Sequence, residues 1–286
     1  MPADNTSPET LQITKRDIEF EFPADMRRWH PDGLHVTHFY NALSLFFPEG
    51  ESFFIDAVRH YKDRVRAPEL AEEVKGFLGQ EAMHSREHRR YNRALTEAGL
   101  PAKALEDRLV KHLDLVRSQV SPAEALAITI ALEHFTAIMA HVVLSDDRIL
   151  QGADPRMAAI WRWHAIEETE HKAVAYDVYR VAVGEGLGAY LRRVRVMLLT
   201  TVTFWAHVFL YHFALIRSEG ALTDVRGWWR LFRFLWIKPG GMWRMWRMWR
   251  MWLEYFRPDF HPWQHDNHEY VDAWKATYAD NGVVPA

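Results

Sequence analysis

Three long segments of this 286-residue chain begin with a proline placed where a helix can start. Proline at the first helical position loses no hydrogen bond, so Pro68, Pro122 and Pro155 favour helix initiation. Ser121 and Glu124 flank Pro122 in the spacing of a capping box, which fixes that start further. With the next turn signals as ends, the sequence predicts helices over residues 68–98, 122–144 and 155–183.

A further helical stretch lies within residues 34–66, and Pro48 predicts a kink in it. A shorter helix is predicted near 102–118, and strand signals are nearly absent. Four long helices joined by short turns indicate an all-α, four-helix bundle. The sequence suggests three parts: an irregular N-terminal segment (1–33), the bundle (34–185) and a basic, aromatic, helical extension (186–286).

Acidic residues and histidines recur within the apolar parts of these helices. Glu81 and His84 form a Glu-x-x-His pair, and Glu168 with His171 forms a second, so each pair lies on one helix face. Glu133 stands alone in an apolar run. An aromatic stretch further upstream contributes Glu51 or, as an alternative, Glu49.

The glutamates lie at similar depths in their helices. Glu81 follows Pro68 by 13 residues, Glu168 follows Pro155 by 13, and Glu133 follows Pro122 by 11. At about 1.5 Å per residue, all three lie roughly 16–20 Å from the helix starts. One Glu from each of two helices and Glu-x-x-His from each of two others is the ligand set of a di-iron or di-manganese carboxylate site. The predicted ligands are Glu51, Glu81, His84, Glu133, Glu168 and His171.

Other polar residues surround this set. His88 lies one turn after His84, and His164 one turn before Glu168, so both are expected to support the ligands, with direct ligation as the alternative. Glu167 and Glu170 are expected on another face of their helix, solvated or capping.

The sequence resembles the ferritin-like di-iron superfamily and, more closely, a bacterial family labelled "predicted metal-dependent hydrolase". The segments that carry the resemblance are FPEGESFF, GQEAMHSREH, ALEHF, HAIEETEHK and RPDFHPW. The resemblance implies a ferritin-like bundle with two metal ions and enzymatic activity.

Two chemistries remain open for such a site. Oxygen- and nitrogen-donor ligands without thiolate suit two iron ions, with manganese or zinc as alternatives. By analogy with the superfamily, we expect O2-dependent oxidation or hydroxylation of a hydrophobic substrate, supported by an electron-donor protein. The alternative is a metal-dependent hydrolase using a metal-bridging hydroxide. Metal storage is a third, non-catalytic interpretation.

The chain contains no cysteine, which excludes disulfides, thiolate metal sites and cysteine nucleophiles. The N-terminal residues lack an apolar signal-peptide core, so we expect a cytoplasmic protein. Contact with the inner face of the cell membrane is compatible with that location.

The C-terminal extension differs in character from the bundle. Residues 186–257 hold 12 Lys and Arg against 3 Asp and Glu, and eight of the 13 Trp. Trp and Arg suit the lipid headgroup region, so peripheral membrane contact and a hydrophobic or lipid substrate are expected. Residues 196–216 are uncharged and long enough to span a bilayer, but a fifth bundle helix is the favoured interpretation.

Two patterns within this extension have simple interpretations. The Met-Trp-Arg repeat over 240–256 has a period of three, so its Trp side chains are expected to spiral around a helix without forming one apolar face. The His-rich tail at 257–268 is expected to be a packed loop instead of a metal-binding tract. No nucleic-acid fold signature accompanies the basic residues, and nucleic acid is not an expected partner.

Overall fold

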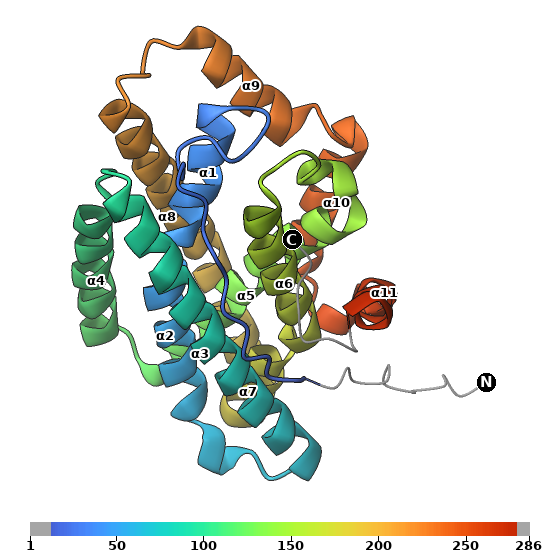
Figure 1. Ribbon diagram of the computed structural model, residues 1–286. Helices are drawn as coiled ribbons and strands as arrows, with labels where there is room; N and C mark the ends of the chain where they lie inside the picture. Colours follow the sequence, from blue (N-terminus) through green and yellow to red (C-terminus); the bar gives the residue numbers. More distant parts are fainter. Residues whose placement is uncertain (1–12, 279–286) are drawn as a thin grey trace.

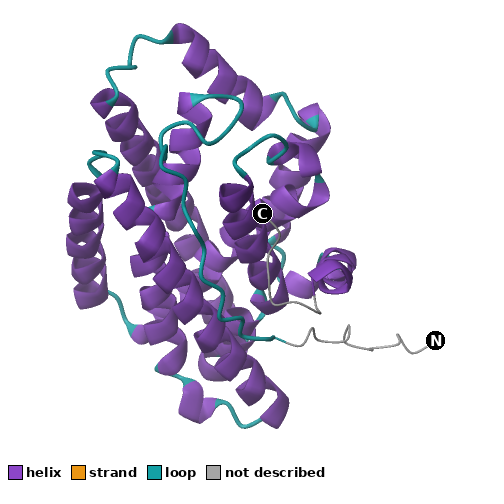
Figure 2. Cartoon of the chain, viewed as in Figure 1, coloured by secondary structure: helices purple, strands orange, loops and turns teal. Residues whose placement is uncertain are grey.

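The computed structural model describes residues 13–278, with side chains through residue 273. Within that part of the chain every regular element is a helix and there is no strand, as Figure 2 shows. The α-helices are α1 (Leu34–Ser44), α2 (Phe47–Arg59), α3 (Pro68–Glu97), α4 (Ala102–Gln119), α5 (Pro122–Ser145), α6 (Pro155–His171), α7 (Val174–Val183), α8 (Leu187–Ser218), α9 (Val225–Trp236), α10 (Gly241–Glu254) and α11 (His268–Tyr278). Short 3-10 helices are η1 (Lys62–Arg64), η2 (Asp147–Ile149) and η3 (Pro262–Gln264). The predicted all-α bundle is confirmed.

Most predicted helix boundaries agree with the structure to within a residue or two. Helices α3, α4 and α5 match their predicted ranges, and the Ser121 hydroxyl accepts a hydrogen bond from the Glu124 backbone in the expected capping box. The region 34–66 holds two separate helices instead of one kinked helix. Pro48 lies in the first turn of α2, where it starts that helix and does not bend one.

The single helix predicted over 155–183 is wrong. It is divided into α6 and α7 by a turn at Lys172 and Ala173. Neither proline nor glycine marks this turn, so no local signal announces it. A tertiary contact accompanies the turn, because the Lys172 ammonium donates to the His265 carbonyl and, at 3.2 Å, to the Asn267 amide oxygen.

Helices α2, α3, α6 and α5 form the ring that holds the centre of the molecule. Helix α2 packs against α3 and α5, and α6 packs against the same two helices, which closes the ring. Figure 1 shows α2 and α3 side by side. Helix α7 continues from α6 and lies near the lower part of α3 in this view. Residues 13–33 form no helix and run along the outside of α3.

Helix α8 lies along the bundle against α1 and α5. Its buried side chains Val208 and Leu215 share one hydrophobic core with α1, and Met197 shares a second core with α2 and α5. Helices α5 and α8 are both long and apolar enough to cross a membrane, but α5 lies largely inside the bundle. Only 33% of the most apolar 18-residue stretch of α8 is buried, so much of this helix is exposed.

Candidate metal centre

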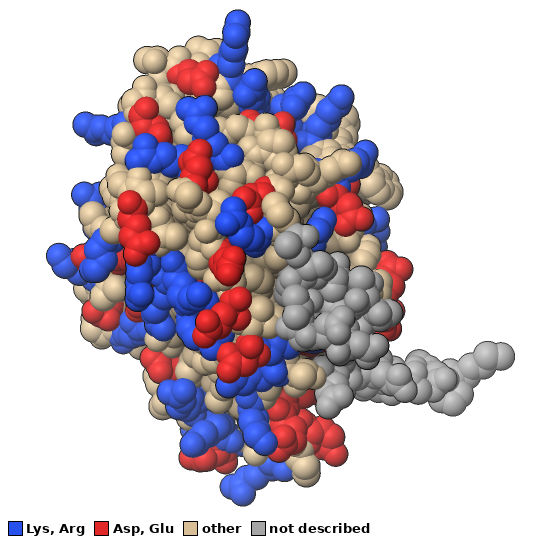
Figure 3. Space-filling model, viewed as in Figure 1, with Lys and Arg blue, Asp and Glu red and all other residues tan. Residues whose placement is uncertain are grey.

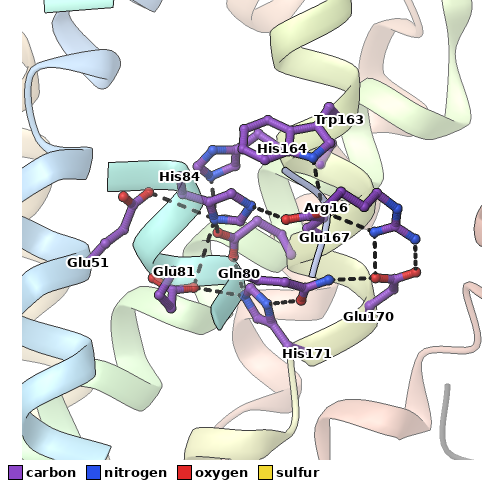
Figure 4. A network of polar contacts seen from close by, with 12 residues as sticks. Arg16, Glu51, Gln80, Glu81, His84, Trp163, His164, Glu167, Glu170 and His171 are labelled. Atoms are coloured by element: carbon purple, nitrogen blue, oxygen red, sulfur yellow. Dashed lines mark hydrogen bonds and ion pairs between the residues drawn. The ribbon is translucent and has the colours of Figure 1, made fainter. Parts of the chain in front are cut away.

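Seven carboxylate and imidazole side chains meet inside the ring of four helices, as Figure 4 shows in part. They are Glu51 on α2, Glu81 and His84 on α3, Glu133 on α5, and His164, Glu168 and His171 on α6. None is more than 4% exposed. The structure therefore brings together all six residues predicted as ligands and adds His164. Glu49, the alternative to Glu51, is only partly buried.

The seven residues divide into two groups that could each hold a metal ion. Within each of two trios, ligand atoms lie within 4.8 Å of one another; the trios are Glu51 with His84 and His164, and Glu81 with Glu168 and His171. Glu133 adjoins the second trio, since its Oε2 lies 3.7 Å from His171 Nε2.

Glu168 and Glu81 connect the two groups. Glu168 Oε1 lies 3.0 Å from His164 Nε2, and its Oε2 lies 3.6 Å from His171 Nε2. Glu81 Oε1 lies 3.1 Å from His171 Nε2 and 3.9 Å from His84 Nδ1. Two carboxylates placed between two imidazole-bearing groups have the arrangement needed to bridge a pair of cations.

The inward-facing atoms have no conventional hydrogen-bond partners. Both carboxylate oxygens of the four central glutamates, and at least one ring nitrogen of each central histidine, make no hydrogen bond of normal geometry within the described residues. Buried polar atoms are rarely left in this state, because the loss of water is not offset. Four carboxylates would balance two divalent cations, so these residues fit a di-metal site.

The electrostatics of the cluster point the same way. Burial, and then the neighbouring Glu81 and Glu168, raises the pKa of Glu51 well above its usual value, and burial does the same for Glu133. Burial also opposes ionisation of Glu168, but His164 and His171 outweigh it and hold its pKa well below normal. The protein alone therefore does not stabilise all four glutamates as carboxylates, which a pair of cations would do.

His171 is oriented by a glutamine from the neighbouring helix. The Gln80 side chain donates from Nε2 to Glu170 Oε2 at 2.7 Å and to the Thr14 carbonyl at 3.1 Å, which fixes the direction of its amide. Gln80 Oε1 therefore accepts from His171 Nδ1 at 2.8 Å. The second ring nitrogen, Nε2, faces Glu81, as a metal-ligating imidazole would.

His164 is oriented by a longer chain of hydrogen bonds. The Ser44 hydroxyl donates to Asn92 Oδ1 at 2.8 Å, so it accepts from His88 Nδ1 at 2.9 Å. His88 Nε2 must then accept from His164 Nδ1, at 3.0 Å. In a neutral His164 the lone pair of Nε2 then faces Glu168 Oε1 at 3.0 Å. A proton or a metal ion must lie between these two atoms to hold them together.

The prediction that Glu167 and Glu170 are solvated is wrong, because both are buried. Arg16, from the N-terminal segment, donates to Glu170 at 2.7 and 2.8 Å and to Glu167 Oε1 at 3.0 Å. The Trp163 indole donates to the same Glu167 oxygen at 2.9 Å. Glu167 Oε2 in turn lies 3.1 Å from His84 Nε2, so the pair of glutamates supports the imidazoles from outside.

Sequence reasoning missed Arg16 and Gln80 as parts of this site. Arg16 lies 151 residues from Glu167 along the chain, in a segment with no regular structure, so no spacing rule connects the two. Gln80 gives a weak signal, because it directly precedes the ligand candidate Glu81.

An apolar cavity of about 340 Å³ reaches the cluster from one side. Glu168 and His164 line its inner end, and Thr136 and Ala140 of α5 line its wall. These two small residues follow Glu133 on α5 and leave room beside the cluster.

The His-rich tail does not contribute to the cluster. His261 Nε2 lies 3.1 Å from Asp177 Oδ1, and the Trp263 ring lies against the Lys172 ammonium at 4.3 Å. These contacts pack the loop on α6 and α7, as predicted.

The fold and the site together define a helical-bundle protein with a buried carboxylate and imidazole centre suited to metal ions. Residues 14–266 match the sequence model of a family described as predicted metal-dependent hydrolases. The chain belongs to this family. Among curated proteins and solved structures, no match was found.

Proposed function

We propose that this protein is a di-metal hydrolase that acts on a hydrophobic substrate. The observation that carries the proposal is the pair of buried ligand groups joined by Glu81 and Glu168, at the inner end of an apolar cavity. Family membership supports the same chemistry. Two adjacent metal ions would activate water and stabilise the negative charge that develops on a carbonyl or phosphoryl oxygen.

The side chains have separable roles in this proposal. Glu81 and Glu168 would be shared between the two ligand groups, Glu51 and Glu133 would each serve one of them, and His84, His164 and His171 would complete them. The proposed ligands are Glu51, Glu81, His84, Glu133, His164, Glu168 and His171. His88 and Gln80 hold two of the imidazoles in the required tautomer. The cavity wall excludes bulk water and holds the apolar part of the substrate, with the reactive group beside Glu168.

One observation favours a second candidate, O2-dependent oxidation by two iron ions. The proposed donor set combines four carboxylates with imidazoles and has no thiolate, and such sites accept iron and manganese readily. An oxidase of this kind would also need an electron-donor protein.

Metal content and turnover distinguish the two candidates. The protein, reconstituted separately with Zn²⁺, Mn²⁺ and Fe²⁺, is assayed without oxygen on p-nitrophenyl esters of increasing acyl length. A hydrolase releases nitrophenol in proportion to bound metal, and oxygen does not change the rate. Oxygen consumption by the ferrous protein without ester turnover would contradict hydrolysis and support oxidation.

A matched pair of variants connects turnover to the centre. Glu133→Gln removes one proposed ligand, so both metal content and ester turnover should fall. Glu185→Gln changes an exposed glutamate paired with Arg180, and it should leave both unchanged. Equal loss in the two variants would contradict the assignment of Glu133.

A further inference from the structure

The cavity that ends at the metal centre has its other end at the molecular surface. Phe209 on α8, Trp236 on α9 and Trp249 on α10 all line the cavity. The same three side chains are 42%, 40% and 50% exposed. A residue that both lines a cavity and faces solvent lies at its mouth, so the cavity opens where α8, α9 and α10 meet.

Each of these three helices presents an apolar stripe to solvent. On α8 the exposed positions follow helical spacing, and α9 and α10 each repeat the spacing i, i+4, i+7, i+11. The stripes are Leu198, Val202, Phe209 and Phe213 on α8; Val225, Trp229, Phe232 and Trp236 on α9; and Met242, Trp246, Trp249 and Leu253 on α10. We call these twelve residues the apolar face.

The apolar face changes the interpretation of the Met-Trp-Arg repeat. The Trp side chains spiral as the sequence predicted, since Trp243, Trp246 and Trp249 are exposed, but Met242 and Leu253 join Trp246 and Trp249 in an exposed apolar stripe on α10. Trp252 is partly buried and donates to the Thr201 hydroxyl at 3.1 Å. Many large apolar side chains exposed on the helices around one cavity mouth mark an interaction surface.

The charges beside the apolar face indicate what covers it. Residues 225–254 contain seven Lys and Arg but one Glu. Arg226 and Lys238 are exposed among them. In Figure 3 Lys and Arg alternate with Asp and Glu over most of the visible side, while basic groups project at the upper edge, where α9 lies in Figure 1. A second copy docking here would bring like charges together, whereas an anionic bilayer attracts them.

We propose that the apolar face docks on an anionic phospholipid bilayer, and that the cavity draws the hydrocarbon chain of a lipid-derived amphiphile from the bilayer to the metal centre. The assignment of the reactive end beside Glu168 rests on the proposed function. The cavity walls are mostly apolar, with Thr136, Thr201 and Arg244 among them, and Glu168 and His164 line the inner end. A bound substrate therefore has its hydrocarbon chain along the cavity walls and its polar group against the metal ligands at the inner end.

Vesicle flotation of the metal-free protein tests the docking surface without any turnover. Phosphatidylcholine vesicles with and without phosphatidylglycerol are compared at low and high salt. Trp229→Ala with Trp246→Ala removes two rings that are 57% and 60% exposed and do not line the cavity. The control, Leu115→Ala with Val181→Ala, removes exposed apolar side chains from α4 and α7.

Wild type and the control should float with the anionic vesicles, and high salt should weaken this binding. The Trp double variant should bind at least tenfold more weakly, with unchanged helical content. Equal flotation of all forms, or of none, overturns the docking proposal. A concentration-dependent dimer in light scattering, abolished by the Trp variant, would overturn it in favour of an interface between copies.

Competition for a fluorescent fatty alcohol tests the cavity, again with metal-free protein, because a neutral head group is not repelled by Glu168. Saturated primary alcohols of 8 to 16 carbons displace the probe. Ala140→Phe narrows the cavity and should shift the preference to shorter chains, and Met248→Ala enlarges it and should shift the preference to longer chains. Unchanged preference in both folded variants overturns the chain-binding role. Since neither assay needs metal or catalysis, a failure here differs from a failure of the hydrolase proposal.

Discussion

Replacing Arg16 by Met should destabilise the protein and weaken metal binding at the same time. The guanidinium is the cation that compensates Glu167 and Glu170, whose side chains are both 0% exposed, while Arg16 itself is 13% exposed. Removing one partner of a buried ion pair leaves an uncompensated charge and costs about 3–5 kcal/mol. Metal affinity should fall about 10- to 100-fold, because Glu170 holds Gln80 and, through it, His171.

Urea unfolding of metal-free protein, followed by circular dichroism, measures the first effect. Competition with a chelator of known affinity measures the second. Burial raises the pKa of Glu167 to about 8, so Glu167 can take up a proton and Glu170 is the main stranded charge. Adding Glu170→Gln to Arg16→Met removes that charge and should restore part of the lost stability. It should not restore metal affinity, since Gln80 still loses a charged partner. A loss below about 1 kcal/mol for Arg16→Met would refute the reasoning, because a surface ion pair costs no more than that.

Three further outcomes follow from single residues. Ser44→Ala should lower metal affinity about tenfold by chelator competition, since the His88 and His164 tautomers are no longer fixed; unchanged affinity would argue against His164 as a ligand. Burial, and then positive charge on nearby histidines, lowers the pKa of His38 to about 3, below its unfolded value of about 6.5. The unfolded state therefore binds more protons between these values, and at pH 5 the folded state loses about 2 kcal/mol through His38. Urea unfolding from pH 7 to 5 should show a smaller loss in His38→Gln, and parallel losses would contradict the assignment. Ser121→Ala should cost about 1 kcal/mol by loss of the α5 cap, seen as a lower thermal midpoint.

The helices carry their own signals in the sequence. Pro68, Pro122 and Pro155 start α3, α5 and α6 where the sequence placed them, because the rules for helix starts are local. The break between α6 and α7 escaped prediction, since neither proline nor glycine marks it and the contact that accompanies it joins Lys172 to a loop 93 residues further along.

The candidate ligands were also accessible from spacing. Two Glu-x-x-His pairs and Glu133 lie at similar depth in their helices, so they can face one another if the helices pack in a ring, and the structure places them together with Glu51. The tautomer of His164, by contrast, depends on Ser44, Asn92 and His88 from two other helices. A series of hydrogen bonds like this one has no fixed spacing in the sequence. The sequence therefore could not decide whether His164 binds a metal ion or supports a residue that does.

The long helices, and the carboxylates and imidazoles at similar depth within them, can be read from the sequence, because helix starts and helix periodicity are properties of neighbouring residues. The pairing of Arg16 with Glu167 and Glu170, and the opening of the cavity beside α8, α9 and α10, arise only in the folded chain. These features join segments far apart in the chain. Their energies come from burial and from the pairing of charges, which exist only once the helices have packed.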